Sequence, residues 1–477
     1  MEAIYETRKE QLLEECNVAP QVFERVMPRL EKFMEPFLDS FVRREQREHA
    51  HTFVQGLLSD LEHKNVESIA YRFGQDRLPL QWFVGRSGWN HQTLRDELVR
   101  QVGEQLGEQD GVIVFDPSAF PKSGHESVGV ARQWCGRLGK LDNCQVAVYM
   151  GYVSSREHAL VDTRLYLPKE WTQDKSRRKK AGVPKEVRHR TRHKLCLEML
   201  AQHGQALPHA WITGDDEMGR PYWFRRHLNE IDEQYLLAVP SVTQIRDLEV
   251  DPPEYGGRGR YPNRPWTRVD KWIETPAKSD WTRVDVRDGS KGPLVVEVVT
   301  RHVVARNQKR QEGHEEILVV VRYRERDSRR VVQTDYYLSN AAPDTSPEEF
   351  ARAAKAEHRI EECLQRAKSE AGLADYEVRN WKGWHHHQIL SLIAVWFLLT
   401  EARRGKKMDT SDHGCASARG DQLHPASSVR MRYTLPHPPR SRTAPQAQRT
   451  CSPVPLEKTQ AISSIEHKQE TNLIQSN

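Results

Sequence analysis

The chain between residues 106 and 240 alternates short apolar runs with polar turns, a pattern that predicts a β-sheet. Residues 112–115 are β-branched or aromatic and are typical of a short buried strand. This run ends at Asp116, and Pro117 is expected to stop the strand there. A carboxylate in that position would lie at the rim of a sheet, where it can reach a ligand from a rigid base, although an isolated Asp-Pro pair more often opens a turn.

The same pattern recurs further along the chain. Two strands and a helix are predicted at residues 146–153, 159–167 and 192–202. The apolar run that follows ends at Asp215, with two more acidic residues directly behind it. Taken alone, this stretch also fits an acidic turn that precedes a helix starting near Tyr222.

The strongest helix signals begin at Ser346. This residue is a typical N-cap, Pro347 occupies the first helical position, and Glu349 completes a Ser-x-x-Glu capping box. Gly372 is expected to end the helix. The helix would present one apolar stripe to a core.

Two acidic neighbours on this predicted helix face in different directions. At about 100° per residue, Glu361 lies at one edge of the apolar stripe, whereas Glu362 points well away from it. Lys368, seven residues after Glu361, shares its face. Glu361 and Lys368 are therefore the better candidates for a site at the sheet, although an ordinary surface position is the default for a helical glutamate.

Composition divides the chain into five segments. Residues 1–105 carry apolar residues at helical spacing and predict a helical N-terminal region. Residues 241–338 predict a mostly β insertion between two parts of a core, residues 106–240 and 339–404. Strands of the insertion are expected at residues 282–286, 294–304, 316–323 and 331–338. Residues 405–477 are rich in Ser, Pro, Arg, Thr and Gln with little apolar periodicity, so we expect them to be disordered.

Composition also argues against several classes of protein. The seven cysteines are scattered and include no Cys-x-x-Cys pair, which favours a reduced cytoplasmic protein over a disulfide scaffold or a zinc module. The start of the chain lacks a signal-peptide pattern, and the longest apolar run, residues 389–399, is too short to span a bilayer. Three adjacent histidines, 385–387, cannot face one point on a helix, so a structural or DNA-facing role is favoured over a metal site.

Local charge is more informative than net charge, because 72 Lys and Arg barely exceed 67 Asp and Glu. A dense basic segment, residues 169–194, lies between the two aspartate runs. A solvated face is the ordinary explanation, but contact with DNA phosphates is the interpretation we favour. The basic residues that we expect to contact DNA are Lys122, Arg132, Arg137, Lys140, Arg177, Arg178, Lys179, Lys180, Arg188, Arg190, Arg258 and Arg260.

These stretches resemble the catalytic segments of bacterial insertion-sequence transposases of the DDE superfamily. The resemblance is specific at residues 116–124, Asp-Pro-Ser-Ala-Phe-Pro-Lys-Ser-Gly, and at residues 136–140, Gly-Arg-Leu-Gly-Lys. The family's second motif is an Asp that precedes a Gly by four residues, which selects Asp215. Its third motif is a Glu followed seven residues later by a Lys, which selects Glu361 and Lys368.

The resemblance implies an RNase H-like mixed sheet with flanking helices, a β insertion and a helical N-terminal domain that helps to bind transposon ends. It implies that Asp116, Asp215 and Glu361 hold two Mg²⁺ or Mn²⁺ ions, with Lys368 placing a phosphate. The expected function is a cut-and-paste DNA transposase that cleaves transposon ends and joins them to target DNA. Its expected partner is double-stranded DNA, bound by a dimer in the bacterial cytoplasm at the nucleoid, with no membrane contact.

The sequence departs from the family pattern at two positions before Glu361. Glu357 stands where relatives have an Arg, and Ala354 where they have a Tyr. Two alternatives therefore stay open. One is an RNase H-like nuclease that cuts without joining, and the other is an inactive, transposase-derived DNA-binding protein.

Overall fold

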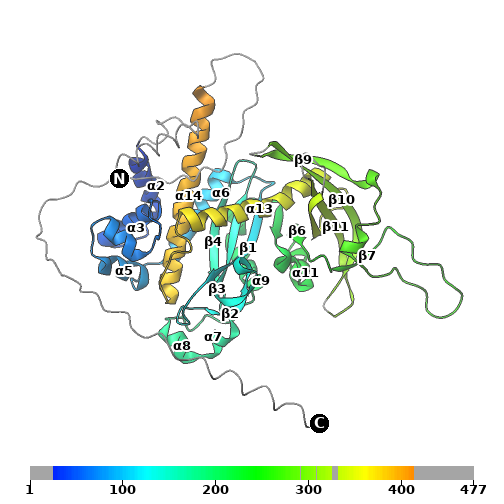
Figure 1. Ribbon diagram of the computed structural model, residues 1–477, viewed down its shortest axis with the longest axis horizontal. Helices are drawn as coiled ribbons and strands as arrows, with labels where there is room; N and C mark the ends of the chain where they lie inside the picture. Colours follow the sequence, from blue (N-terminus) through cyan, green and yellow to red (C-terminus); the bar gives the residue numbers. More distant parts are fainter. Residues whose placement is uncertain (1–24, 290–291, 308, 325–330, 413–477) are drawn as a thin grey trace, which may run out of the picture. The chain divides into compact units, whose positions relative to one another are not determined.

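A mixed β-sheet of twelve strands is the centre of the fold in the part of the chain that the structure describes (Figure 1). The computed structural model describes residues 25–289, 292–307, 309–324 and 331–412. The strands follow the order β2-β3-β1-β5-β6-β12-β11-β10-β7-β8, with β4 also paired to β3 and β9 to β10. They are β1 (Val112–Pro121), β2 (Ala131–Cys135), β3 (Lys140–Val153), β4 (His158–Leu165), β5 (Trp211–Gly214), β6 (Tyr235–Ala238), β7 (Gln244–Asp247), β8 (Thr267–Arg268), β9 (Thr282–Gly289), β10 (Gly292–Arg306), β11 (Glu312–Arg324) and β12 (Val331–Ser339).

The strands around β1 give the sheet its mixed character. β1 pairs antiparallel with β3 and parallel with β5, and β5 pairs parallel with β6. β3 and β4 are antiparallel. Three antiparallel strands followed by two parallel ones, with helices on the sheet, agree with the predicted RNase H-like fold class.

The prediction that β1 stops at Pro117 is wrong. The strand continues to Pro121, and its antiparallel register with β3 runs through Asp116↔Tyr149 to the end. On the other side, the parallel register with β5 ends at Phe115↔Gly214. A proline has no N–H to donate, but it is tolerated where one neighbouring strand is missing. Asp116 therefore lies at the point where β5 leaves β1, in mid-strand rather than at a strand end.

The inserted strands extend the core sheet. β12 joins the insertion to β6 through an antiparallel pairing that includes Tyr337↔Ala238. β9 to β12 occur where strands were predicted in residues 282–338. The insertion also has its own apolar cluster, which includes Val303, Leu318 and Leu338. Hydrogen bonds thus run without interruption from the core strands into the insertion.

Some helices pack on the sheet, and others form the N-terminal part of the chain. They are α2 (Val26–Leu38), α3 (Arg44–Leu57), α4 (Val66–Arg72), α5 (Arg77–Gly85), α6 (His91–Leu106), α7 (Lys169–Gln173), α8 (Lys175–Lys180), α9 (Arg192–His203), α10 (Asp216–Gly219), α11 (Tyr222–Glu230), α12 (Val269–Trp272), α13 (Pro347–Glu370) and α14 (Trp381–Asp412), with short 3₁₀ turns at Gly136–Leu138 (η2), Gly204–Ala206 (η3) and Lys278–Asp280 (η4). Among these, none combines the length and apolar character needed to cross a membrane.

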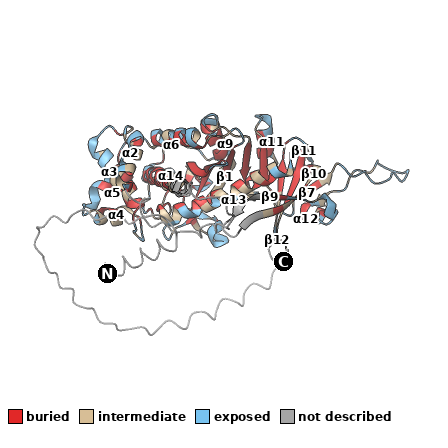
Figure 2. Cartoon of the chain, turned by 90° about the horizontal axis from the view of Figure 1, so that it is seen from above, coloured by how far each residue is buried: buried red, intermediate tan, exposed pale blue. Residues whose placement is uncertain are grey.

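The long helix α14 connects the N-terminal helices to the sheet. It contacts α3, α5 and α6 on one side and β4 on the other, and Figure 2 shows its buried surface. His386 stacks on Trp89 with ring centroids 3.5 Å apart, and its nitrogens contact backbone carbonyls at 2.9 and 3.1 Å. His386 and its neighbours therefore have a structural role, which is one of the two roles that the sequence predicted. α14 continues past residue 404 to Asp412, and residues 413–477 lie outside the described residues.

The helix α13 begins and ends as its sequence indicates, except that the Glu349 side chain bonds to Trp211 of β5. The Ser346 hydroxyl accepts a hydrogen bond from the Glu349 N–H at 3.2 Å, and Gly372 has a positive φ of 61°. The Glu349 carboxylate accepts a hydrogen bond from the Trp211 indole at 3.1 Å. This contact fastens the start of α13 to β5.

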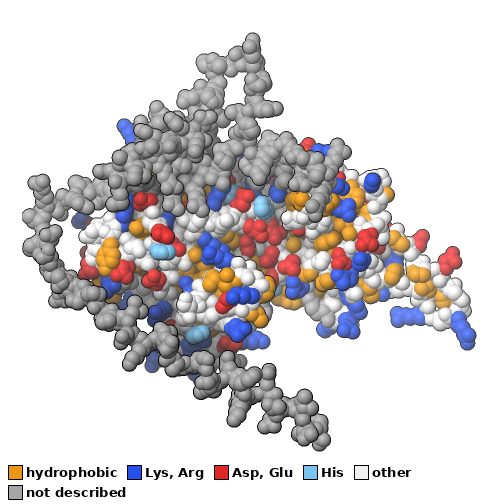
Figure 3. Space-filling model, in the orientation of Figure 1, with side chains coloured by type: hydrophobic (Ala, Val, Ile, Leu, Met, Phe, Trp, Pro, Cys, Tyr) orange, Lys and Arg blue, Asp and Glu red, His pale blue; other side chains and the backbone are white. Residues whose placement is uncertain are grey.

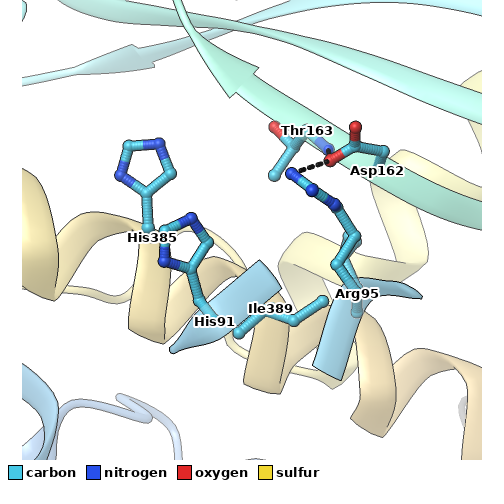
Figure 4. A pocket seen from close by; sticks show the side chains of 7 residues that line it. His91, Arg95, Asp162, Thr163, His385 and Ile389 are labelled. Carbon is cyan, nitrogen blue, oxygen red and sulfur yellow. Dashed lines mark hydrogen bonds and ion pairs between the residues drawn. The ribbon is translucent and has the colours of Figure 1, made fainter. Parts of the chain in front are cut away.

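A buried ion-pair network fixes α6 to β4 (Figure 4). The Asp162 carboxylate lies 3.7 Å from Arg95, the contact drawn in Figure 4. It also lies 2.9 Å from Arg164 and 3.3 Å from His203. Burial would raise the pKa of Asp162, but Arg164, His203 and Arg95 outweigh it and hold this pKa below its usual range. Burial lowers the pKa of the neighbouring His385 to about 3. The small cavity lined by Arg95, Asp162 and His385 therefore contains an ion-paired carboxylate beside a neutral imidazole, which is a structural arrangement.

Replacing Asp162 by Asn should destabilise the fold at pH 7 by about 3 kcal/mol, because Arg95 and Arg164 would keep buried charges without a counterion. The ionised carboxylate stabilises the protein above its unfolded pKa of 3.8, and that stabilisation is lost as pH falls through the lower folded value. Urea unfolding of both proteins from pH 7 down to pH 3 should show that the difference in their free energies of unfolding becomes smaller in acid.

The matched control for this prediction is Asp96→Asn. Asp96 also contacts Arg95, at 3.4 Å, but its side chain is 56% exposed. Its loss should change stability by less than about 0.5 kcal/mol. Equal effects at the two positions would contradict a buried network at Asp162.

Candidate active site

Asp116 is the centre of a group of carboxyls at the edge where β5 leaves β1. Its side chain is partly buried, and burial raises the pKa of this carboxyl well above its usual range. The negative charges of Asp215 and Glu361 raise the pKa further, while the Lys368 ammonium lowers it. The four side chains that the sequence selected therefore lie within electrostatic reach of one another.

Asp215 directly follows β5 and caps the short helix α10. Its carboxylate accepts a hydrogen bond from the Met218 N–H at 3.1 Å. Burial raises the pKa of Asp215 to about 7, with the charges of Glu217 and Asp216 adding to the rise. Asp215 is thus both an ordinary N-cap and one of the carboxyls that gather around Asp116. The two interpretations of this stretch are therefore compatible.

Lys368 reaches the site from α13 and contacts β1. Its ammonium donates a hydrogen bond to the Ser118 hydroxyl at 2.6 Å and lies 5.4 Å from the centroid of the Phe120 ring. Burial lowers the pKa of Lys368, whereas the charge of Asp116 raises it. A cation held between a carboxylate and open solvent is well placed to bind a phosphate oxygen.

Glu361 lies on the outer side of this group. Its side chain is 57% exposed and lies 3.4 Å from His358, which also lies 3.5 Å from Glu362. The negative charge of Glu361 acts on both Asp116 and Asp335 of β12. Glu361 therefore faces the acids, but it is more exposed than a ligand of a closed site would be.

Glu357 is the site residue that the sequence interpretation missed. Burial raises the pKa of its carboxyl well above the usual range, and the charges of Asp215, Glu361 and Asp116 add to this. Within the described residues, its carboxyl forms no hydrogen bond or ion pair. The signal was available, because residues four apart on a helix share a face. In the family pattern this position holds an arginine, which drew attention away from the carboxyl that Glu357 brings.

A close approach of α13 to the sheet holds these glutamates over β1. A Cβ added at Gly151 of β3 would come within 2.4 Å of the Ile360 side chain. Only glycine therefore lets Ile360 pack flat on the strand, and Ile360 is fully buried there. Figure 1 shows α13 crossing β1 and β4, and Figure 3 shows acidic side chains gathered over this crossing.

The donor chemistry of this group fits Mg²⁺ or Mn²⁺, because both ions prefer hard carboxylate oxygens. Burial and neighbouring negative charges raise the pKa values of Asp116, Asp215 and Glu357, so a bound divalent cation would favour their ionised forms. Over the described part of the chain, however, no three His, Cys, Asp or Glu side chains already lie in an arrangement that would hold one ion. The carboxyls are neighbours that a cation would still have to draw together.

Several of the expected DNA contacts have structural roles. The Lys122 ammonium lies 3.6 Å from the centroid of the Tyr376 ring, and burial lowers the pKa of Lys122 to about 8. Arg177 donates to a backbone carbonyl at 2.6 Å, as do Arg178 at 2.7 Å and Arg188 at 2.7 Å. These side chains hold loops of the protein itself.

Other expected contacts are surface ion pairs or are exposed. Lys140 lies 3.1 Å from Asp142, Arg190 lies 2.8 Å from Glu198, and Lys180 pairs with Glu126. Five are exposed and have no hydrogen-bond or ion-pair partner within the described ranges: Arg132, Arg137, Lys179, Arg258 and Arg260. Arg137 is close enough to lower the pKa of Lys368, so the turn between β2 and β3 borders the site.

Comparison with known proteins decides the family. Residues 36–293, more than half of the chain, match the family described as DDE superfamily endonuclease. The chain belongs to this family. As a DDE superfamily endonuclease, it has Asp116 and Asp215 inside the matched range, whereas α13 with both glutamates lies beyond it. The predicted family is confirmed.

A curated relative of this DDE superfamily endonuclease is the probable transposase for insertion sequence element IS701 of Microchaete diplosiphon. The two sequences are 37% identical over 97 residues, which is 20% of this chain and 25% of the relative. The chain thus spans about a quarter of the length of that relative.

Replacing Asp215 by Asn should stabilise the metal-free protein at pH 8. The folded pKa of about 7 lies above the usual 3.8, so the wild type loses stability as pH rises through this range, and Asn cannot ionise. We expect a gain on the order of 1–4 kcal/mol at pH 8 and almost none near pH 4. Urea unfolding in EDTA at the two pH values measures it.

Asp216→Asn is the matched control, because its side chain is 51% exposed and pairs with Arg220 at 2.8 Å. It should shift the pH dependence of unfolding only slightly, because the charge of Asp216 raises the pKa of Asp215 less than burial and Glu217 do. Addition of Mg²⁺ at pH 8 should narrow the gap between the wild type and Asp215→Asn. A gap of the same size at both pH values would argue against a destabilised carboxylate.

Proposed function

We propose that this DDE superfamily endonuclease is a DNA transposase that cleaves transposon ends and joins them to target DNA. The observation that carries the proposal is the convergence of Asp116, Asp215, Glu357 and Glu361 beside Lys368. These residues come from β1, the end of β5 and α13, which are far apart in the sequence. A structural role alone would not favour a group of carboxyls that destabilise one another.

Asp116, Asp215 and Glu361 would hold two Mg²⁺ or Mn²⁺ ions. When bound, such ions activate a water or a 3′-hydroxyl for attack on a phosphodiester and stabilise the leaving oxygen. Lys368 would bind a non-bridging phosphate oxygen, with its ammonium oriented by Ser118. The same centre can hydrolyse a strand and then join it, because the two reactions differ only in the attacking hydroxyl.

We assign Glu357 a supporting role beside Asp215. Its carboxyl is more buried than that of Glu361, so once a divalent cation favours its ionised form, its negative charge would strengthen the binding of that cation. It also takes the place where an arginine would bring a positive charge. The charge balance at this end of α13 is therefore more acidic than the family pattern implies.

The proposed partner is double-stranded DNA, with transposon ends bound by a dimer in the bacterial cytoplasm at the nucleoid. Exposed basic side chains without partners among the described residues support this: Arg132 lies in β2, and Arg137 lies on the β2–β3 turn near Lys368. Phosphates that reach the carboxyls would pass this turn.

Alanine at Asp116, Asp215 or Glu361 should abolish Mg²⁺-dependent cleavage of end-containing DNA and leave DNA binding intact. The loss should exceed the roughly 10- to 100-fold typical of a residue that only supports a metal ligand. Glu357→Gln should fall within that range, and Glu362→Ala should be mild. Equal losses at Glu361 and Glu362 would contradict the assignment of the helical face.

The products of the same assay separate the proposal from its rivals. Joined DNA that contains both end and target sequence supports a transposase. Cleavage of many sequences without joined product would indicate a nuclease instead. Tight binding of ends with no cleavage in Mg²⁺ or Mn²⁺ would indicate an inactive relative.

Four exposed lysines test the basic segment between the two aspartates. Lys175, Lys179, Lys185 and Lys194 have no side-chain partner within the described residues, whereas Arg177 and Arg178 are structural. Replacing the four by Ala should weaken binding about equally on all sequences. The slope of log affinity against log salt should become shallower by roughly 0.9 per lost phosphate contact.

The matched control removes four exposed lysines elsewhere, at Lys32, Lys271, Lys278 and Lys309. It changes the net charge equally and should leave the salt slope nearly unchanged. A salt titration on cognate and random duplexes measures both variants. An unchanged slope in the first variant would mean that the segment is only a solvated face.

A further inference from the structure

Residues 248–266, which we name the arm, connect β7 to β8 and extend beyond the sheet. Figure 1 shows this green segment projecting past β7, and Figure 3 shows basic side chains at its outer end. Every residue from Glu249 to Tyr261 is exposed. A projection of this kind carries no apolar core, so packing of the fold does not explain it.

The base of the arm is held by several contacts. β7 and β8 pair antiparallel, and the Arg264 guanidinium donates to the Val250 carbonyl at 2.6 Å. Further out, the rings of Tyr255 and Tyr261 stack with centroids 4.2 Å apart, and the Tyr255 hydroxyl donates to the Gly259 carbonyl at 3.1 Å. These contacts close the chain into a narrow loop whose tip is residues 256–260.

The tip is thin and basic. Its sequence is Gly-Gly-Arg-Gly-Arg, with φ of 76° at Gly257 and 89° at Gly259. A Cβ at either glycine, or at Gly256, would meet no atom within 4 Å, so no crowding inside the protein requires their small size. The positive φ values explain two of the glycines as turn formers. The outcome is a ribbon with almost no side-chain bulk apart from two arginines.

The arginines of the tip form no ion pair with the arm's own acids, Glu249, Asp251 and Glu254, within the described residues. Arg258 and Arg260 form no hydrogen bond or ion pair within the described part of the chain, and no acidic residue stands between Tyr255 and Tyr261. Glu249, at the base, pairs instead with Arg301 at 2.6 Å. Two guanidiniums are thus displayed together at the end of a thin projection.

We propose that the arm enters the minor groove of A·T-rich duplex DNA and places Arg258 and Arg260 inside it. This rests on the proposed function, which makes DNA the substrate. The minor groove is only about 6 Å wide, so a chain rich in glycine fits where a helix cannot. Narrow A·T tracts concentrate negative potential in this groove and attract arginine.

The alternative contacts predict different preferences. Arginine in the major groove would pair with guanine edges and favour G·C pairs. Arginine on phosphates would give no base preference and a steeper salt dependence. The width of the tip favours the minor groove, because a side chain reaching into the major groove does not need a bare backbone behind it.

The experiment compares binding of the full chain to two duplexes of about 30 base pairs, roughly three helical turns. One contains a central A·T tract, the other is G·C throughout, and fluorescence anisotropy gives both affinities. The wild type should prefer the A·T duplex, and a minor-groove oligopyrrole should compete for it. Arg258→Ala with Arg260→Ala should weaken A·T binding by about tenfold, as for loss of one base-specific contact, and leave G·C binding nearly unchanged.

Two variants control for charge. Arg258→Lys with Arg260→Lys keeps the charge, but should lose most of the A·T preference because an ammonium is more strongly hydrated than a guanidinium. Lys271→Ala with Lys278→Ala removes two exposed charges from the same insertion and should keep the preference.

Three results would overturn the proposal: equal weakening on both duplexes, a G·C preference that the arginines create, or no effect of the double alanine variant. Failure of the wild type to bind either duplex would instead overturn the proposed function and the arm with it. Binding without an A·T preference would overturn only the proposed role of the arm.

Discussion

Burial of carboxyls beside one another is the constraint on which the rest of this structure depends. Asp116, Asp215 and Glu357 are held close in a partly buried place, and each is harder to ionise than it would be in water. A fold can hold such a group only if other interactions fix the strands and the helix that bear these carboxyls. The protein is thus arranged to keep in place a site that, without a cation, favours its own disruption.

The fixing interactions lie outside the site and comprise apolar packing, a hydrogen bond and a buried ion-pair network. Gly151 admits Ile360 so that α13 rests directly on the sheet, and the Glu349–Trp211 hydrogen bond fastens the start of that helix. On the far side, α14 packs between the N-terminal helices and β4, and the Asp162 network ties α6 to the same strand. Rigid surroundings of this kind place charged groups without relying on attraction between them.

Local patterns predicted the parts of the fold that depend on neighbours in sequence. The cap of α13, the strands of the insertion and the two aspartates at β1 and β5 followed from periodicity, turn residues and a family motif. The extent of β1 did not, because it depends on which strand lies on each side of Pro117. The surroundings of Glu357 and Arg177 did not follow from the sequence for the same reason. Whether a charged side chain meets other carboxyls or a carbonyl such as that of His125 is decided by segments distant in the chain.

The continuity of the sheet has a geometric consequence for DNA. From β1 to β8 the strand order takes seven steps, each roughly 4.8 Å, which separates the carboxyls from the base of the arm by about 34 Å. One turn of B-form DNA is about 34–36 Å long. A duplex lying along the sheet would therefore present the same side to both ends of it. In the proposed complex, the hydrogen-bonded strands would keep the carboxyls and the arm about one helical turn of DNA apart.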